Sequence, residues 1–152
     1  MAEIGRAAVT AAFIALLGAP PAVIGDEPAY VVDGLSIPTP LTSEPGDADR
    51  GRRIVRDASN ASCLICHAMP IPEEPNHGTL GPPLDGVADR LSEGELRLRL
   101  VDPKRVNPQT IMPAYFKADG LYRVNKPYVG ETIYTAQEIE DVVAYLASLR
   151  KQ

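Results

Sequence analysis

The chain has 152 residues, which is enough for one domain with a modest core. Hydrophobic residues make up 45% of the chain, so its composition is not that of a disordered protein. The net charge of -5 would be repelled by nucleic-acid phosphates, which excludes nucleic acid as an expected partner. The 15 prolines indicate that much of the chain is loop or extended coil.

The first 25 residues are predicted to be a signal peptide. An uncharged, mostly apolar run follows Arg6 and ends at Ala19. This run is too short to span a bilayer, which needs about 20 apolar residues. It suits the apolar region of a signal peptide, with cleavage after Gly25, although a buried apolar helix is the alternative. Export places the mature chain in an oxidising compartment, the periplasm of a bacterial host, and leaves no membrane span in it.

Residues 26–46 are rich in proline and show no helical pattern. They are expected to form an extended N-terminal arm, which either lies on the domain or binds a partner. The domain itself is predicted to cover residues 47–152.

Three helices separated by long loops are expected in this domain. Asp47 can cap the first helix, over 48–57. Ser92 and a glutamate three residues later form a capping box for the second helix, which ends before Pro103. Thr135 opens the last helix with a second capping box. One face of this helix is apolar: Ile139, Val142, Val143, Leu146 and Leu149. These patterns predict an all-α domain.

Two cysteines in an exported protein would usually form a disulfide, but here they stand at Cys63 and Cys66 and are followed by His67. Two intervening residues on a helical turn let both sulfurs bond one edge of a haem, and the histidine then points its imidazole at the iron. The spacing therefore indicates one covalently attached c-type haem, with His67 as an iron ligand. A redox dithiol or half of a zinc site is the competing interpretation.

A six-coordinate electron carrier needs a second iron ligand on the other face of the haem. Met69, Met112 and His77 are the candidates. Met69 lies too close to His67 in the chain to reach the other face easily. Pro113 stiffens the loop after Met112, which helps to hold a weak thioether ligand, so Met112 is favoured over His77. The carbonyl of Pro82 is a candidate acceptor for the other ring N–H of His67.

The order of these features resembles a class I cytochrome c domain over about residues 47–150. Four runs also resemble the SoxX family, the monohaem subunits of the SoxAX cytochromes of bacterial sulfur oxidation. The runs are HGTLGPPLDG at 77–86, VDPKRVN at 101–107, TIMPAY at 110–115 and TAQEIEDVVAYL at 135–146. The family's axial ligands correspond to His67 and Met112.

The resemblance implies a heterodimer with a SoxA-type cytochrome subunit. Such a complex joins thiosulfate oxidatively to a cysteine of the carrier protein SoxYZ, and the chemistry belongs to the SoxA partner. The SoxX subunit accepts the electrons and passes them to a soluble acceptor.

A non-catalytic role is also expected from the residues themselves. Cys63 and Cys66 are both used for haem attachment, so no thiol remains as a nucleophile. A haem with two protein ligands has no open position for substrate. The alternatives are a free-standing periplasmic electron-shuttle cytochrome c, or a ligand sensor whose methionine can be displaced.

Overall fold

The computed structural model describes residues 30–151. The predicted signal peptide over 1–25 and the first residues of the arm lie outside this range. The described chain contains three α-helices: α1 (Ala48–Arg56), α2 (Glu93–Val101) and α3 (Ala136–Ser148). Four single turns of 3₁₀-helix interrupt the loops: η1 (Cys63–Ile65), η2 (Val87–Asp89), η3 (Pro103–Arg105) and η4 (Lys126–Tyr128). Residues 30–151 form no sheet, only an isolated bridge between Asp33 and Ser36.

All three helices begin where their capping residues predict. The Asp47 side chain accepts a hydrogen bond from the Arg50 N–H, which satisfies one free donor at the start of α1. Ser92 and Thr135 each form a complete capping box with the glutamate three residues later. Local sequence therefore marks where each helix starts.

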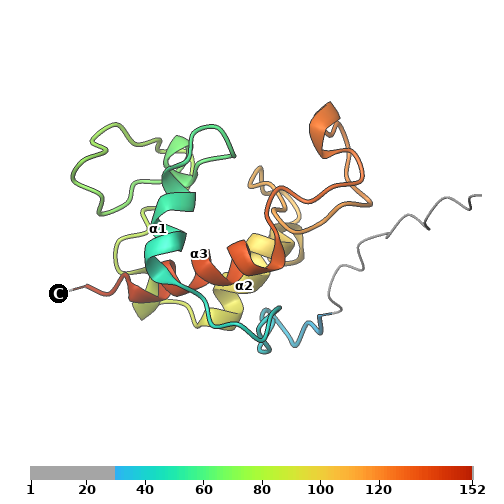
Figure 1. Cartoon of the computed structure of the whole chain (residues 1–152), viewed down its shortest axis with the longest axis horizontal. Helices are drawn as coiled ribbons and strands as arrows, with labels where there is room; N and C mark the ends of the chain where they lie inside the picture. Colours follow the sequence, from blue (N-terminus) through green and yellow to red (C-terminus); the bar gives the residue numbers. More distant parts are fainter. Residues whose placement is uncertain (1–29, 152) are drawn as a thin grey trace, which may run out of the picture.

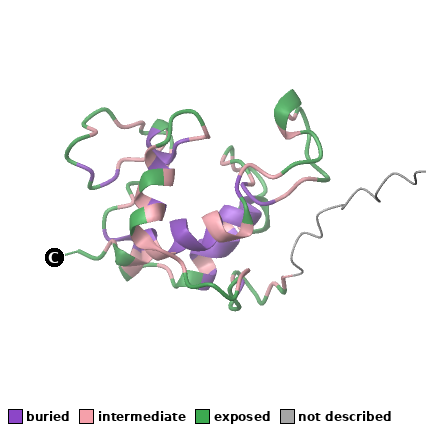
Figure 2. Cartoon of the chain, viewed as in Figure 1, coloured by how far each residue is buried: buried purple, intermediate pink, exposed green. Residues whose placement is uncertain are grey.

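Helices α1 and α3 cross at close range (Figure 1). The contact point on α1 is Gly51, where a side chain would overlap the main-chain carbonyl of Asp141 and the Cβ of Tyr145. Glycine costs about 1 kcal/mol relative to alanine inside a helix, and here the missing side chain allows the two backbones to touch. The purple segments of α2 and α3 in Figure 2 are the buried centre of the fold, whereas the loops are mostly exposed.

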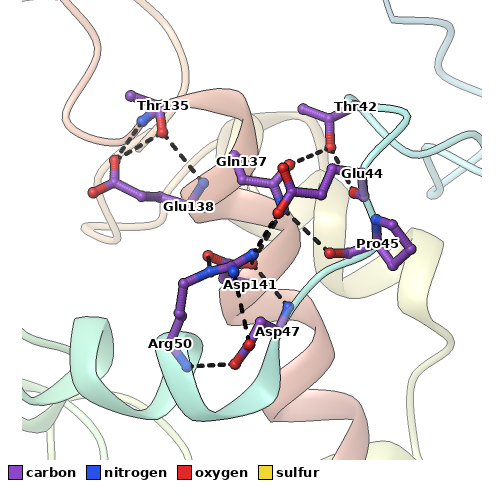
Figure 3. A network of polar contacts seen from close by, with 9 residues as sticks. All are labelled: Thr42, Glu44, Pro45, Asp47, Arg50, Thr135, Gln137, Glu138 and Asp141. Carbon is purple, nitrogen blue, oxygen red and sulfur yellow. Dashed lines mark hydrogen bonds and ion pairs between the residues drawn. The ribbon is translucent and has the colours of Figure 1, made fainter.

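The carboxylate of Asp141 ties α1 to α3 (Figure 3). It accepts hydrogen bonds from the Asp47 N–H at 2.8 Å, from Nε and Nη2 of Arg50 at 2.7 and 2.9 Å, and from Nε2 of Gln137 at 3.2 Å. Burial pushes the pKa of Asp141 up, but the hydrogen bonds from Arg50, Asp47 and Gln137 outweigh burial and hold it below its ordinary value. The carboxylate therefore stays ionised and keeps its partners at neutral pH.

The described part of the arm, residues 30–46, lies along α2 and α3. Ile37 is fully buried, and its N–H donates to the Gly94 carbonyl oxygen at 2.9 Å. The Leu41 N–H donates to the Glu140 carboxylate at 2.8 Å. The sequence left open whether the arm lies on the domain or binds a partner. Residues 30–46 lie on the domain.

A buried ion pair holds the arm in place. Arg97 of α2 donates from Nε and Nη2 to the two carboxylate oxygens of Glu140 on α3, at 2.7 and 2.8 Å. The remaining Nη1 donates to the Ile37 carbonyl oxygen at 2.7 Å. Both side chains are almost completely buried. One bidentate pair therefore joins α2, α3 and the arm.

None of the helices described here is long and apolar enough to cross a membrane.

We predict that Glu140→Gln lowers the free energy of unfolding by about 3–5 kcal/mol, because it leaves the buried Arg97 charge without a counter-charge. Urea unfolding of the full chain measures this loss. Glu73→Gln is the matched control, since Glu73 pairs with Arg52 and Arg56 at the surface and its loss should cost no more than about 1 kcal/mol. Equal losses in the two variants would contradict the role given to the buried pair.

Candidate functional site

A cavity of about 720 Å³ opens between the segment after α1, helix α2 and the loops on either side of α2. It is lined largely by apolar side chains, among them Leu84, Leu96, Leu100 and Leu146. Four of the five residues predicted for the site also line it: Cys63, His67, Pro82 and Met112. Residues spread over 50 positions of sequence thus meet at one concave surface.

Helical turn η1 positions the two cysteines. Ser62 accepts a hydrogen bond from the Leu64 N–H and donates to the Val55 carbonyl oxygen at 2.8 Å, which ties the turn to the end of α1. The His67 N–H donates to the Cys63 carbonyl oxygen at 2.9 Å and continues the turn. Cys63 and Cys66 are not joined in a disulfide.

The environment of Cys63 disfavours the redox-dithiol interpretation of the motif. Burial, with a smaller contribution from Cys66, raises the pKa of the Cys63 thiol to about 12. A thiol held protonated at neutral pH is a poor nucleophile. Within residues 30–151, no group of three His, Cys, Asp or Glu side chains gathers to hold a metal ion.

The imidazole of His67 is held from two directions. Its Nδ1 lies 2.7 Å from the Pro82 carbonyl oxygen. A carbonyl can only accept, so Nδ1 carries the proton and Nε2 keeps a free lone pair, as a metal ligand requires. Gly81 packs flat against the ring, and a side chain there would overlap it. The Gly81 N–H donates to the Cys66 carbonyl oxygen at 2.8 Å, which fixes this approach.

The three candidates for the second ligand lie in different environments. Met112 is half-buried and lines the cavity. Met69 is buried in the core away from the cavity, and its N–H donates to Nδ1 of His77 at 3.2 Å. His77 does not line the cavity either. This arrangement favours Met112 as the ligand and gives His77 a structural contact with the backbone.

Two tyrosines that were not among the predicted site residues support the cavity wall. Tyr115 lines the cavity and stacks on Tyr134, with ring centroids 4.7 Å apart. Burial raises the pKa of Tyr115 well above its ordinary value, with the neighbouring Cys63 adding to the effect. The Tyr134 hydroxyl donates to the Asn60 carbonyl oxygen at 3.2 Å, just before η1. The only signal in the sequence was that Tyr115 stands three residues after Met112.

Comparison with known proteins agrees with this geometry. The model of the cytochrome c family matches residues 48–150. The chain belongs to the cytochrome c family. A chain of the crystal structure of SoxXA from P. pantotrophus is 35% identical to it, with a TM-score of 0.73, and the match covers 80% of this chain and 95% of that one. These matches confirm the class I cytochrome c fold and the resemblance to SoxX. The search of curated proteins found no match.

A cytochrome c domain carries covalent haem c, and the residues present here fit that group. The cavity volume lies within the range of about 300–1,000 Å³ that is usual for ligand sites. Its wall is largely apolar, and it is lined by the Cys63 thiol of η1, the oriented imidazole of His67 just after η1, and the Met112 thioether in the loop after α2. Cys63 and Cys66 would attach the haem, and His67 and Met112 would hold the iron.

We predict that Cys63→Ser leaves the haem attached by a single bond through Cys66, or lost from the chain. Mass spectrometry of the intact chain and a pyridine haemochrome spectrum distinguish one, two or no thioether bonds. A normal doubly attached haem in this variant would contradict the attachment site.

We predict that Met112→Ala abolishes the far-red absorbance of a methionine-ligated ferric haem, because the thioether is removed from the cavity. His77→Ala is the matched control and should keep that band. The opposite pattern, with the band kept in Met112→Ala and lost in His77→Ala, would identify His77 as the ligand.

Proposed function

We propose that this chain is the electron-accepting subunit of a SoxAX-type thiosulfate-oxidising complex. The observation that carries the proposal is the likeness to a SoxXA chain over 95% of that chain, combined with a cavity that is lined by both predicted iron ligands, His67 and Met112. The haem is single, since Cys63 to His67 is the only C-x-x-C-H motif in the sequence. When bound, haem c supplies one-electron redox chemistry.

The residues of the site support electron transfer rather than catalysis. Cys63 and Cys66 would both be bonded to the haem, which would leave no thiol to attack thiosulfate. His67 and Met112 would both hold the iron, which would leave no position open to substrate. Joining thiosulfate to a cysteine of SoxYZ releases two electrons, and this step belongs to the SoxA-type partner. The present chain receives the electrons one at a time and passes them to a soluble acceptor.

An exposed apolar surface next to the attachment site supports a protein partner. Residues 78–81 run beside η1, with hydrogen bonds of 2.8 Å from the Gly78 N–H to the Leu64 carbonyl and from the Gly81 N–H to the Cys66 carbonyl. Ile65 and Leu80 project from these two segments and are 61% and 72% exposed. Apolar side chains held this far into water beside a redox site suit contact with another protein.

A periplasmic location belongs to the same proposal, and the signal peptide predicted over 1–25 supports it. An oxidising compartment suits a protein whose cysteines are consumed by a cofactor rather than kept as thiols.

We predict that the chain co-purifies with a SoxA-type subunit produced in the same cells, and that thiosulfate with SoxYZ reduces its haem only when that subunit is present. Ile65→Glu with Leu80→Glu should weaken the heterodimer at least about tenfold, because a charge would be buried in an apolar contact. Val31→Glu is the matched control, since Val31 is equally exposed but lies on the arm.

A chain that stays monomeric, and exchanges electrons equally well with several redox proteins, would instead support the free-standing shuttle. Reduction of the haem by thiosulfate in the isolated chain would contradict a purely electron-accepting role.

A further inference from the structure

Ala61 has a backbone conformation that alanine rarely adopts. Its φ is 55°, in the left-handed region, and it stands two residues before Cys63. A residue with a Cβ is strained there, and it keeps this conformation only when its surroundings hold it. The chain enters η1 through Ala61, so this conformation sets the direction in which the cysteine turn begins.

The hydroxyl of Tyr134 holds this conformation. It lies 3.2 Å from the Asn60 carbonyl oxygen and 3.3 Å from the Ala61 carbonyl oxygen, and it donates its one proton between them. These carbonyls belong to the two planar peptide groups on either side of the Ala61 Cα, and φ and ψ of Ala61 set the angle between the groups. A donor shared by both oxygens therefore restrains both dihedral angles. Burial raises the pKa of Tyr134 well above its ordinary value, so the hydroxyl keeps its proton.

Further hydrogen bonds hold the residues on either side of Ala61. The Tyr128 hydroxyl donates to Oδ1 of Asn60 at 3.3 Å. The Ser62 hydroxyl donates to the Val55 carbonyl oxygen at the end of α1, at 2.8 Å. The strained residue thus lies between two anchored neighbours.

The ring and the backbone of Tyr134 contact the segment that carries Met112. The ring stacks on Tyr115, with ring centroids 4.7 Å apart, and the Tyr134 N–H donates to the Tyr115 carbonyl oxygen at 2.9 Å. Tyr115 stands three residues after Met112, and both residues line the cavity. Tyr134 itself is only 1% exposed. One buried tyrosine therefore joins the entrance of η1 to the loop of Met112.

We propose that Tyr134 is a positioning residue that fixes Met112 relative to the turn of Cys63 and His67, and thereby keeps the thioether on the iron. This inference rests on the proposed covalent haem and its two axial ligands. The ligands come from separate segments, so their separation depends on what joins those segments. Loosening this link raises the fraction of molecules in which the iron has lost its thioether, and an added ligand binds that fraction.

The test is an imidazole titration of the purified ferric holoprotein, followed by the far-red absorbance of the methionine ligand. Tyr134→Phe removes the hydroxyl but keeps the ring, so the stack on Tyr115 remains. This variant should bind imidazole about tenfold more tightly than the wild type, because the iron loses its thioether more often. An affinity equal to that of the wild type would overturn the proposal.

Tyr145→Phe is the matched control. Tyr145 is another buried tyrosine, lies on α3, and has a hydroxyl that contacts Arg52 rather than the turn before η1. Its loss should leave the imidazole affinity unchanged. An equal gain of affinity in both variants would indicate general loosening of the fold and would overturn the positioning role.

A second substitution tests whether Tyr134 acts through Ala61. Glycine adopts positive φ without strain, so Ala61→Gly no longer needs the hydroxyl to hold the turn. Adding Ala61→Gly to Tyr134→Phe should therefore restore most of the wild-type imidazole affinity. Failure of this rescue would overturn the action through Ala61.

Hydrogen exchange in the same holoprotein gives a readout that does not depend on the iron ligands. The N–H groups of Cys66 and His67 both donate to the Cys63 carbonyl oxygen, at 3.1 and 2.9 Å. In Tyr134→Phe they should exchange about tenfold faster than in the wild type. The Asp102 N–H, which donates to the Leu98 carbonyl oxygen at the end of α2, should keep its rate. Unchanged exchange in η1 would contradict the hold on the turn.

Failure of the proposed function is separately visible. A pyridine haemochrome spectrum reports covalent haem in each protein before titration. Wild-type protein without covalent haem would overturn both proposals. A normal haem with unchanged imidazole affinity would overturn only the role of Tyr134.

Discussion

The crossing of α1 and α3 is the constraint on which the rest of this structure depends. Gly51 lets the two helix backbones touch, and the Asp141 carboxylate then joins the first turn of α1 to the middle of α3. Because η1 is tied to the end of α1 through Ser62, fixing α1 also fixes the cysteines and His67. One close helix contact thus sets the position of one side of the cavity.

The opposite side of the cavity is fixed by α2, which is held by a different interaction. The pair of Arg97 with Glu140 joins α2 to α3 and fastens the arm over both. Helix α3 therefore carries two adjacent acidic residues with separate tasks: Glu140 holds α2 and Asp141 holds α1. The cavity therefore lies between α1 with η1 on one side and α2 on the other, and both sides are held in place by α3.

Much of this arrangement follows from local sequence. The capping residues Asp47, Ser92 and Thr135 set the helix starts. The spacing of Cys63, Cys66 and His67 predicts the attachment site, and the structure places Cys63 and His67 on the cavity wall. What could not be predicted depends on residues far apart in the chain. The pairing of Arg97 with Glu140 joins positions 43 residues apart, and nothing in either segment marks the other as its partner. The choice between Met112 and His77 likewise needed the loop to be placed, because both residues lie in loops long enough to reach a haem.

The loop that carries Met112 contains no α-helix, but hydrogen bonds hold it firmly to the rest of the fold. The Tyr115 N–H bonds the Leu100 carbonyl at 2.8 Å, and the Tyr134 N–H bonds the Tyr115 carbonyl at 2.9 Å, so the loop is clamped between α2 and the approach to α3. The Tyr115–Tyr134 stack reinforces the clamp. Under the proposed function, a thioether ligand on such a segment would have little room to relax when the metal changes its oxidation state. The protein around it would then contribute little reorganisation energy, so electrons would enter and leave the site with a small driving force.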